Sequence, residues 1–254
     1  MPLTYAIGDV HGRRDLLAAL LAAIGEDAAG RDARIVFLGD IIDRGPESRQ
    51  SLDLVIRTLE TWPGSRLIQG NHEEFLLTFI DAASPEDRQV AARRWLPNGG
   101  IETLRSYGFA ETEPLDDIAG RLAAEFPAHI TTLRHAEWMV ETGHYALVHG
   151  GVDPDLPLAA QDPKTTRWIR DRFLSFRGPL PKIVVHGHTM TESSLPELHS
   201  NRIALDTGAV HSGHLTCAVF DGDAPPRFLA TDDHGPAVEV DEIRPLDCRS
   251  RDQR

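Results

Sequence analysis

Short apolar runs and amphipathic stretches alternate along the first third of the chain. Leu3 to Ile7 is a compact apolar run, and the apolar residues after it recur at helical spacing, with Gly25 as a stop signal. This pattern predicts a strand, a loop and a helix. The helical positions are Leu16, Leu17, Leu20, Leu21 and Ile24.

The same unit recurs twice. Ile35 to Leu38 leads into a loop, and the stretch opened by Pro46 carries apolar residues at helical spacing as far as Leu59. A third copy runs from Arg66 to Ile68 and then into Phe75 to Ile80. Alternating strands and helices of this kind predict an α/β fold whose loops converge at the carboxyl ends of the strands.

The pattern changes in the middle of the chain. From about residue 85 to 136 it is helical and polar, and prolines and glycines interrupt it, which predicts a helical insertion or cap. Strand character returns afterwards, and Thr142 with Gly143 predicts a hairpin turn. The expected strands are Trp138 to Val140, Ala146 to Val148, Ile183 to Val185, Ile203 to Leu205 and Leu215 to Phe220.

Prolines and charges from about Asp232 onward predict a loose carboxyl-terminal tail. We therefore expect one domain over residues 1–235, with the insertion at about 85–136, and a tail over 236–254. A chain of 254 residues can fold as a single domain of this size.

Charge and cysteine content restrict the classes of partner. With 26 basic and 39 acidic residues the net charge is −13, so the surface as a whole repels nucleic acid and anionic membranes. An anionic substrate then needs a local cationic site. Cys217 and Cys248 are too few for a disulfide framework. The sequence also shows no signal peptide pattern and no apolar run of the ~20 residues that a membrane-spanning helix needs. We expect a cytoplasmic protein.

Metal-binding and phosphate-binding residue types follow the first two expected strands. In GDVHG, residues 8–12, Asp9 and His11 are two apart on an extended segment, so both side chains can point the same way. In GDIIDRG, residues 39–45, Asp40 directly follows the strand and its two oxygens can bridge two cations. Arg44 in the same loop offers a planar fork of donors to a phosphate. The structural alternatives are a turn aspartate with a buried histidine, and a surface ion pair of Asp43 with Arg44.

Three later motifs extend this set. In GNHE, residues 70–73, Asn71 is either a carboxamide ligand or a helix cap, and His72 is the natural general acid, with Asp43 as the carboxylate that raises its pKa. His149 follows one apolar run, and HGHT, residues 186–189, follows another. A lone histidine beside a strand is more often structural, but the recurrence of the arrangement favours ligands.

The mixture of residue types has a consequence for charge. Two divalent cations held by two aspartates and by neutral imidazoles and an amide keep a net charge of roughly +2, which attracts a phosphate dianion. Two such cations lower the pKa of a bridging water towards ~7, which supplies a hydroxide for in-line attack without a covalent intermediate. Arg44 and Arg170 would neutralise the phosphoryl oxygens. The sequence therefore predicts a dinuclear phosphomonoester hydrolase.

The order and spacing of GDVHG, GDIIDRG, GNHE, HGG and HGHT resemble the phosphoprotein phosphatase branch of the calcineurin-like metallophosphoesterases over nearly the whole chain. An NGG segment at residues 98–100 and DTGAV at 206–210 are similar to the bacterial and phage subgroup typified by the lambda phage protein phosphatase. Where many broader metallophosphoesterases have a further histidine ligand, this chain has Met190, which favours the protein phosphatase branch.

The resemblance implies a set of site residues. It implies one metal on Asp9, His11 and Asp40 and the other on Asp40, Asn71, His149 and His188. It also implies His72 as the acid with Asp43 behind it, and phosphate contacts from Arg44 and from Arg170, which has Arg167 and Arg172 nearby. It selects His188 over His186, which becomes structural, and it gives His211 and His214 no expected place at the site.

The resemblance also implies a fold and an activity. The fold is an α/β four-layer αββα sandwich, and the activity is that of a serine/threonine protein phosphatase that uses two divalent cations, Mn²⁺ first, with iron or zinc compatible. The substrate would be a phosphorylated protein or a small phosphoester. Two alternatives remain open, namely a symmetrical diadenosine tetraphosphate hydrolase and an inactive scaffold that binds phosphate.

Overall fold

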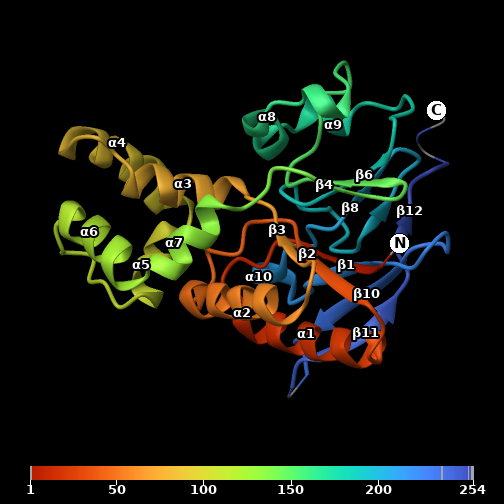
Figure 1. Ribbon diagram of the computed structural model, residues 1–254, viewed down its shortest axis with the longest axis horizontal. Coiled ribbons are helices and arrows are strands. Elements are labelled where there is room, and N and C mark those ends of the chain that lie inside the picture. The colour runs from red at the N-terminus through yellow and green to blue at the C-terminus, as the bar shows by residue number, and fades with distance from the viewer. Residues whose placement is uncertain (1, 236, 251, 253–254) are drawn as a thin grey trace.

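Two six-stranded sheets form the centre of the protein (Figure 1). The computed structural model describes residues 2–235, 237–250 and 252. The first sheet has the order β11-β10-β9-β1-β2-β3, and the second has the order β12-β7-β8-β6-β5-β4. The strands of the first sheet are β1 (Leu3–Ile7), β2 (Ala33–Phe37), β3 (Arg66–Leu67), β9 (Thr216–Phe220), β10 (Arg227–Asp232) and β11 (Glu239–Ile243). Those of the second are β4 (Val140–Thr142), β5 (Tyr145–Leu147), β6 (Ile183–His186), β7 (Glu197–Leu198), β8 (Arg202–Ala204) and β12 (Leu246–Asp247).

Parallel pairing places several strand ends at the same edge. In the first sheet β1 pairs in parallel with β2, and β2 with β3. In the second sheet β5 pairs in parallel with β6, and β6 with β8. The candidate ligands lie in or just after the loops that follow β1, β2, β3, β5 and β6. These loops therefore leave each sheet at the edge where its parallel strands end.

Alternation along the strands separates three apolar layers. Tyr5 and Ile7 of β1 face the helices α1 (Arg14–Ala28) and α2 (Ser48–Thr61), whereas Ala6 faces the second sheet. Between the sheets, Tyr145 of β5 packs on Phe220 of β9 with ring centroids 4.1 Å apart. On the outer face of the second sheet, residues of β5 and β6 pack under short helical segments, which are η2 (Leu158–Ala160), α8 (Pro163–Trp168) and α9 (Asp171–Leu174). The layers confirm the expected α/β sandwich.

The expected insertion is helical and stands to one side of the sheets (Figure 1). It packs against α3 (Asn71–Ile80) and α2. Its prolines begin helices instead of ending them, because Pro85 and Pro127 occupy first helical positions, where no backbone N–H is needed. The segments are α4 (Pro85–Trp95), η1 (Leu96–Asn98), α5 (Gly100–Ser106), α6 (Leu115–Glu125) and α7 (Pro127–Arg134).

Two expectations need correction, one about the end of the first helix and one about the carboxyl-terminal segment. The first helix does not stop at Gly25, which is an exposed residue inside α1; the helix ends at Ala28, and Ala29 takes the left-handed conformation. The end of the chain is not a loose tail over its described part. β11 pairs with β10 and β12 with β7. Val240 of β11 packs on the core, while its charged neighbours, which suggested a tail, face solvent. Residues 236, 251, 253 and 254 lie outside the described residues.

Candidate dinuclear metal centre

The six candidate ligands gather where parallel strands of both sheets end. The first sheet contributes four of them from the loops after β1, β2 and β3, and the second contributes two from the loops after β5 and β6. In chain order they are Asp9, His11, Asp40, Asn71, His149 and His188. All six are buried.

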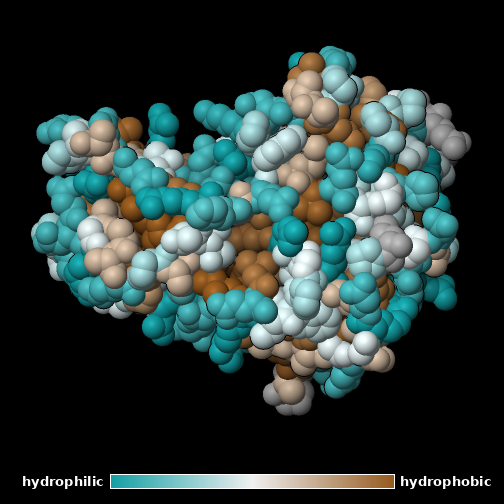
Figure 2. Space-filling view, in the orientation of Figure 1, coloured by the Kyte–Doolittle hydropathy of each residue, from teal (hydrophilic) through white to brown (hydrophobic). Residues whose placement is uncertain are grey.

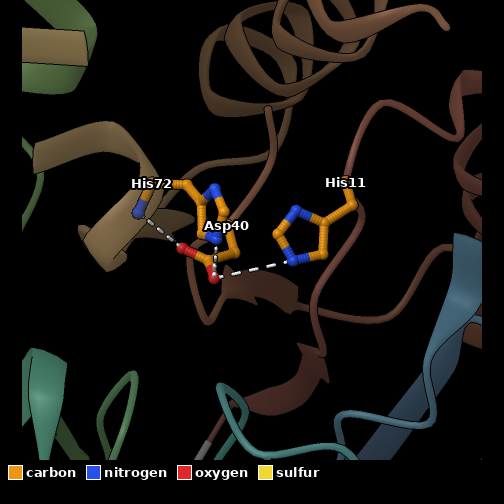
Figure 3. Close-up of side chains that lie close together, drawn as sticks. All are labelled: His11, Asp40 and His72. Atoms are coloured by element: carbon orange, nitrogen blue, oxygen red, sulfur yellow. Dashed lines mark hydrogen bonds and ion pairs between the residues drawn. The ribbon is translucent and has the colours of Figure 1, made fainter. Parts of the chain in front are cut away.

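Asp40 lies in the middle of this group. Its Oδ2 atom is 3.6 Å from Nε2 of His11, 3.8 Å from Nε2 of His72 and 3.4 Å from Nε2 of His149. Figure 3 shows His11, from the loop after β1, and His72, from the start of α3, approaching this carboxylate. Ligand atoms of Asp40, His149 and His188 also lie within 4.8 Å of one another. One carboxylate is therefore common to two sets of ligand atoms, as a bridge between two cations requires.

Backbone carbonyls fix the tautomers of two imidazoles. Nδ1 of His11 is 2.8 Å from the carbonyl oxygen of Ile42, and Nδ1 of His149 is 2.8 Å from that of Leu38. A carbonyl only accepts, so in both rings Nδ1 carries a proton and Nε2 is the nitrogen that faces Asp40. Both imidazoles are thus preset to bind a cation.

The Nε2 atoms of His149 and His188 both face a position that a cation could occupy. Nε2 of His149 lies 3.0 Å from Oδ1 of Asn71, although the carbonyl at Nδ1 makes Nε2 an acceptor, so a proton or a cation must lie between them. Burial opposes the protonated form, but the negative charge of Asp40 raises the pKa of His149 to about 9. Nε2 of His188 is buried and has no hydrogen-bond partner among the described residues. These donors fit a metal.

Asp9 is held against the HGHT loop. Its carboxylate accepts hydrogen bonds from the backbone N–H of His188, with Oδ1 at 3.2 Å and Oδ2 at 3.0 Å. A Cβ atom at Gly187 would collide with Oδ1 of Asp9, so only glycine lets the loop approach this closely. Burial and the nearby carboxylate of Asp206 raise the pKa of Asp9 well above its ordinary value. This excess of buried negative charge is what a divalent cation would relieve.

The loops of the first sheet carry strained backbone. His11, Asp40, Asp43 and Arg44 have φ angles of 45°, 50°, 74° and 68°, in the left-handed region that side chains with a Cβ disfavour. In the HGHT loop, His188 has a φ of 65°. Such residues persist only where surrounding contacts hold them, and they are concentrated at functional sites.

Glu73 supplies much of that support, and its role was not identified from the sequence. Its buried carboxylate accepts hydrogen bonds from the backbone N–H groups of Asp40, Ile41 and Gly70 at 2.8 to 2.9 Å. The carboxylate thereby joins the GDIIDRG loop to the start of α3. Gly70 is the cap of this helix, so the alternative role of Asn71 as a cap is wrong.

Asp43 holds His72, and the helical insertion holds Asp43. Nδ1 of His72 is 2.7 Å from Oδ2 of Asp43, which also accepts from Nε1 of Trp95 at 2.9 Å and, through Oδ1, from Oγ1 of Thr103 at 2.6 Å. Burial lowers the pKa of His72, but the carboxylates of Asp40 and Asp43 outweigh it and raise the pKa above its ordinary value. The alternative of a surface ion pair with Arg44 is excluded, because Asp43 is fully buried.

Arg44 reaches into the centre from the same loop. Its guanidinium lies 2.8 Å from Nε2 of His11 and 3.0 Å from Nε2 of His72. Arg44 and Arg170 also line one cavity of about 180 Å³ beside His11 and His188. Two cations that face the candidate ligands across one cavity provide a place for a phosphate.

Three histidines outside the ligand set can now be placed. His211 lines the same cavity, so the expectation that it lies away from the site is wrong; it follows DTGAV, whose Asp206 lines the cavity too. His186 is buried against Phe173, with ring centroids 5.1 Å apart. His214 packs near His234, with ring centroids 5.9 Å apart. Only the DTGAV segment itself could have indicated the position of His211 from the sequence.

Comparison with known proteins identifies the class. The family model of the calcineurin-like phosphoesterases matches residues 3–215, so the chain belongs to this family. Its activity is that of a metal-dependent phosphatase. Among the described residues, no helix combines the length and the apolar character needed to cross a membrane.

Individual relatives divide between two activities. The chain is 28% identical over 226 residues to serine/threonine-protein phosphatase 1 of Salmonella typhimurium, covering 84% of this chain and 90% of the relative. It is 33% identical over 150 residues to a symmetrical bis(5'-nucleosyl)-tetraphosphatase of Ralstonia nicotianae, covering 59% of this chain but only 42% of the relative.

Solved structures share the fold. A putative diadenosine tetraphosphatase superposes with a TM-score of 0.58 at 19% identity, covering 96% of this chain and 94% of that one. A cold-active protein tyrosine phosphatase superposes with a TM-score of 0.60 at 16% identity, covering 96% and 79%. At these identities the likeness concerns the architecture alone.

Proposed function

We propose that the protein is a serine/threonine protein phosphatase with two divalent cations at the centre built around Asp40. The observation that carries this proposal is the position of Asp40, whose carboxylate is shared by two groups of ligand atoms, beside a cavity that His11, His188, Arg44 and Arg170 line. One relative that this chain matches over most of both lengths is a serine/threonine-protein phosphatase, which supports a phosphoprotein substrate.

Each residue has a role in this proposal. Asp9, His11 and Asp40 hold one cation, and Asp40, Asn71, His149 and His188 hold the other. When bound, the two cations supply Lewis acidity and lower the pKa of a water for in-line attack on phosphorus. Arg44 and Arg170 bind the phosphoryl oxygens, a role supported by their position along the cavity beside His11 and His188. Nε2 of His72 lies 3.0 Å from the guanidinium of Arg44, and the protonated ring donates its proton from this atom to the leaving oxygen.

We assign Mn²⁺ as the preferred cation, because mixed carboxylate, imidazole and amide ligation suits manganese better than calcium or magnesium. Iron and zinc accept the same donors. The chain has only two cysteines, too few for a disulfide framework, which fits a reducing compartment, and the cytoplasm is our proposal for the location.

A symmetrical dinucleoside tetraphosphate hydrolase is the second candidate. It is favoured by the 33% identity to the relative with that activity, although the alignment covers less than half of that relative. Initial rates of Mn²⁺-loaded protein on a phosphothreonine peptide and on diadenosine tetraphosphate would decide between the two. We expect a higher kcat/KM on the peptide; a preference for the dinucleotide would assign the second activity, and fully metallated protein inactive on both, and on an aryl phosphate, would indicate a scaffold.

A further inference from the structure

A groove runs away from the metal centre between α3, α4 and α8. It has a volume of about 410 Å³. Figure 2 shows an indentation of the surface between the arm that carries α4 and the lobe that carries α8, with hydrophilic side chains along its rim. Its lining includes Phe75, Arg93, Arg94, Asn98, Lys164 and Trp168.

Aromatic contacts connect the groove directly to the centre. The ring centroid of Phe75 is 5.9 Å from that of His72, and Trp168 is 6.3 Å from His188. Phe75 and Trp168 pack on each other edge to face at 5.2 Å. A substrate whose phosphate sits at the metal centre would therefore continue over these two rings into the groove.

The cations of the groove are free of carboxylate partners. Arg93, Arg94 and Lys164 are exposed, and none of them forms an ion pair with a residue that the structure describes. The remaining arginines of the insertion do pair with carboxylates, and these are Arg88, Arg105, Arg121 and Arg134. The insertion thus leaves unpaired only the two arginines that face the groove.

The one carboxylate of the groove is already neutralised. Oε2 of Glu74 accepts from Nε of Arg167 at 2.8 Å and from Nε1 of Trp168 at 2.9 Å. The groove is therefore positive on a chain whose net charge is −13. Such a local reversal of sign attracts an anionic partner against the repulsion of the rest of the surface.

We propose that this groove is the site that determines substrate specificity, and that it binds acidic side chains next to the phosphorylated residue of a phosphopeptide. The inference rests on the proposed phosphatase function and names its preferred substrate. The cationic side chains of Arg93, Arg94 and Lys164 pair with the acidic residues of the peptide. The rings of Phe75 and Trp168 contact the part of the peptide that lies between these cations and the metal centre.

The groove suits a peptide better than a nucleotide. Phe75 and Trp168 meet edge to face, and the indole N–H of Trp168 is tied to Glu74, so the two rings do not form parallel faces that clamp a base. The exposed side chains of Thr78 and Asn98 line the same groove and can pair with the backbone groups of an extended peptide.

The test compares two phosphothreonine peptides that differ only in glutamate or glutamine at the positions flanking the phosphorylated residue. The full-length Mn²⁺-loaded protein should show a kcat/KM about tenfold higher on the acidic peptide, chiefly through KM, and this ratio should fall as NaCl is raised, because exposed charge pairs are screened. The triple variant Arg93→Gln, Arg94→Gln, Lys164→Gln should lose the preference.

A matched control carries the same change of charge elsewhere. Arg14, Arg57 and Arg244 are exposed and also lack a described carboxylate partner, so Arg14→Gln, Arg57→Gln, Arg244→Gln should keep the full preference. Equal loss in both triple variants would reduce the effect to net charge and overturn the assignment of the groove. A groove variant that loses more on diadenosine tetraphosphate than on the acidic peptide would overturn it as well.

Hydrolysis of an aryl phosphate by the wild-type protein separates this inference from the proposed function. If aryl phosphate and both peptides are hydrolysed with no acidic preference, the groove assignment fails and the phosphatase stands. If none is hydrolysed, the proposed function itself fails.

Discussion

The two sheets contribute different chemistry to the same centre. The first sheet supplies both carboxylates, Asp9 and Asp40, whereas the second supplies only the imidazoles of His149 and His188. In the proposed arrangement one cation is held by the first sheet alone, and the other spans both sheets. The first site therefore forms within one layer, and the second depends on how the layers pack.

The backbone of the two sheets differs in the same sense. The loops of the first sheet carry four of the left-handed residues, and the carboxylate of Glu73 fastens the GDIIDRG loop to α3 through three backbone N–H groups. The HGHT loop of the second sheet is held by the backbone N–H of Gly187, which donates to the carbonyl of His149, and by that of His188, which donates to Asp9, itself a candidate ligand. The loop of the second sheet is therefore tied to the first sheet through a candidate ligand, whereas the GDIIDRG loop is tied to α3 by a residue outside the ligand set.

The largest effect is expected where the two halves meet. Asp40→Asn removes the carboxylate common to both sets of ligands and should abolish turnover and the binding of both cations, a loss beyond the ~10²–10⁴-fold that a general acid contributes. Metal analysis and phosphatase assays measure the two outcomes. A variant that keeps two cations would show that Asp40 does not bridge.

His188→Ala should distinguish the sheets. The substitution removes a candidate ligand that belongs to the second sheet, so bound Mn²⁺ should fall from about two ions to one per chain. Activity should fall by more than the ~10–100-fold that is typical when a group that only orients a ligand is lost. His11→Ala is the matched substitution in the first sheet. If the two variants lose the same cation in competition titrations, the division between the sheets is wrong.

His72→Ala should leave both cations in place and slow the chemistry. His72 belongs to the first sheet's side of the centre but contacts Asp43 as well as Asp40, so we expect a loss of about 10²–10⁴-fold on phosphothreonine peptides and a smaller one on aryl phosphates, whose leaving groups need no proton. Equal losses on both substrates contradict the acid role. Loss of a cation would instead make His72 a ligand with His11 and Asp40.

The smallest effect is a shift in pH dependence. The carboxylate of Asp43 helps to raise the pKa of His72, and the acid works only while protonated, so kcat falls as the pH rises through that pKa. Asp43→Asn removes the charge and should move this alkaline limb to lower pH by roughly one pH unit. Profiles of kcat against pH for both proteins provide the measurement, and a limb that stays in place removes Asp43 from the role.

Much of the first sheet was predictable because its strands and ligands follow one another in sequence. Leu3–Ile7 is found as expected, and each of the first three strands leads directly to a candidate ligand. β7 and β12 were missed because they have only two residues each, and β11 because it carries exposed charges. β10 was missed although four of its six residues are buried.

The support of the acid was not predictable for a different reason. Trp95 and Thr103 lie 52 and 60 residues from Asp43, in a segment without ligand types, and only the packing of the insertion brings them to its carboxylate. His211 reaches the cavity in the same way, from the short helix α10 (Ala209–Ser212) that follows β8. Spacing along a chain carries no information about such contacts.

β11 and β12 are consecutive strands, yet the first completes one sheet and the second completes the other. The segment from β11 to β12 thus links the two sheets of the sandwich. Proteolytic removal of the chain from Glu239 onward would break this link without removing any candidate ligand. In the proposed arrangement, the cation held by ligands from both sheets would then dissociate first.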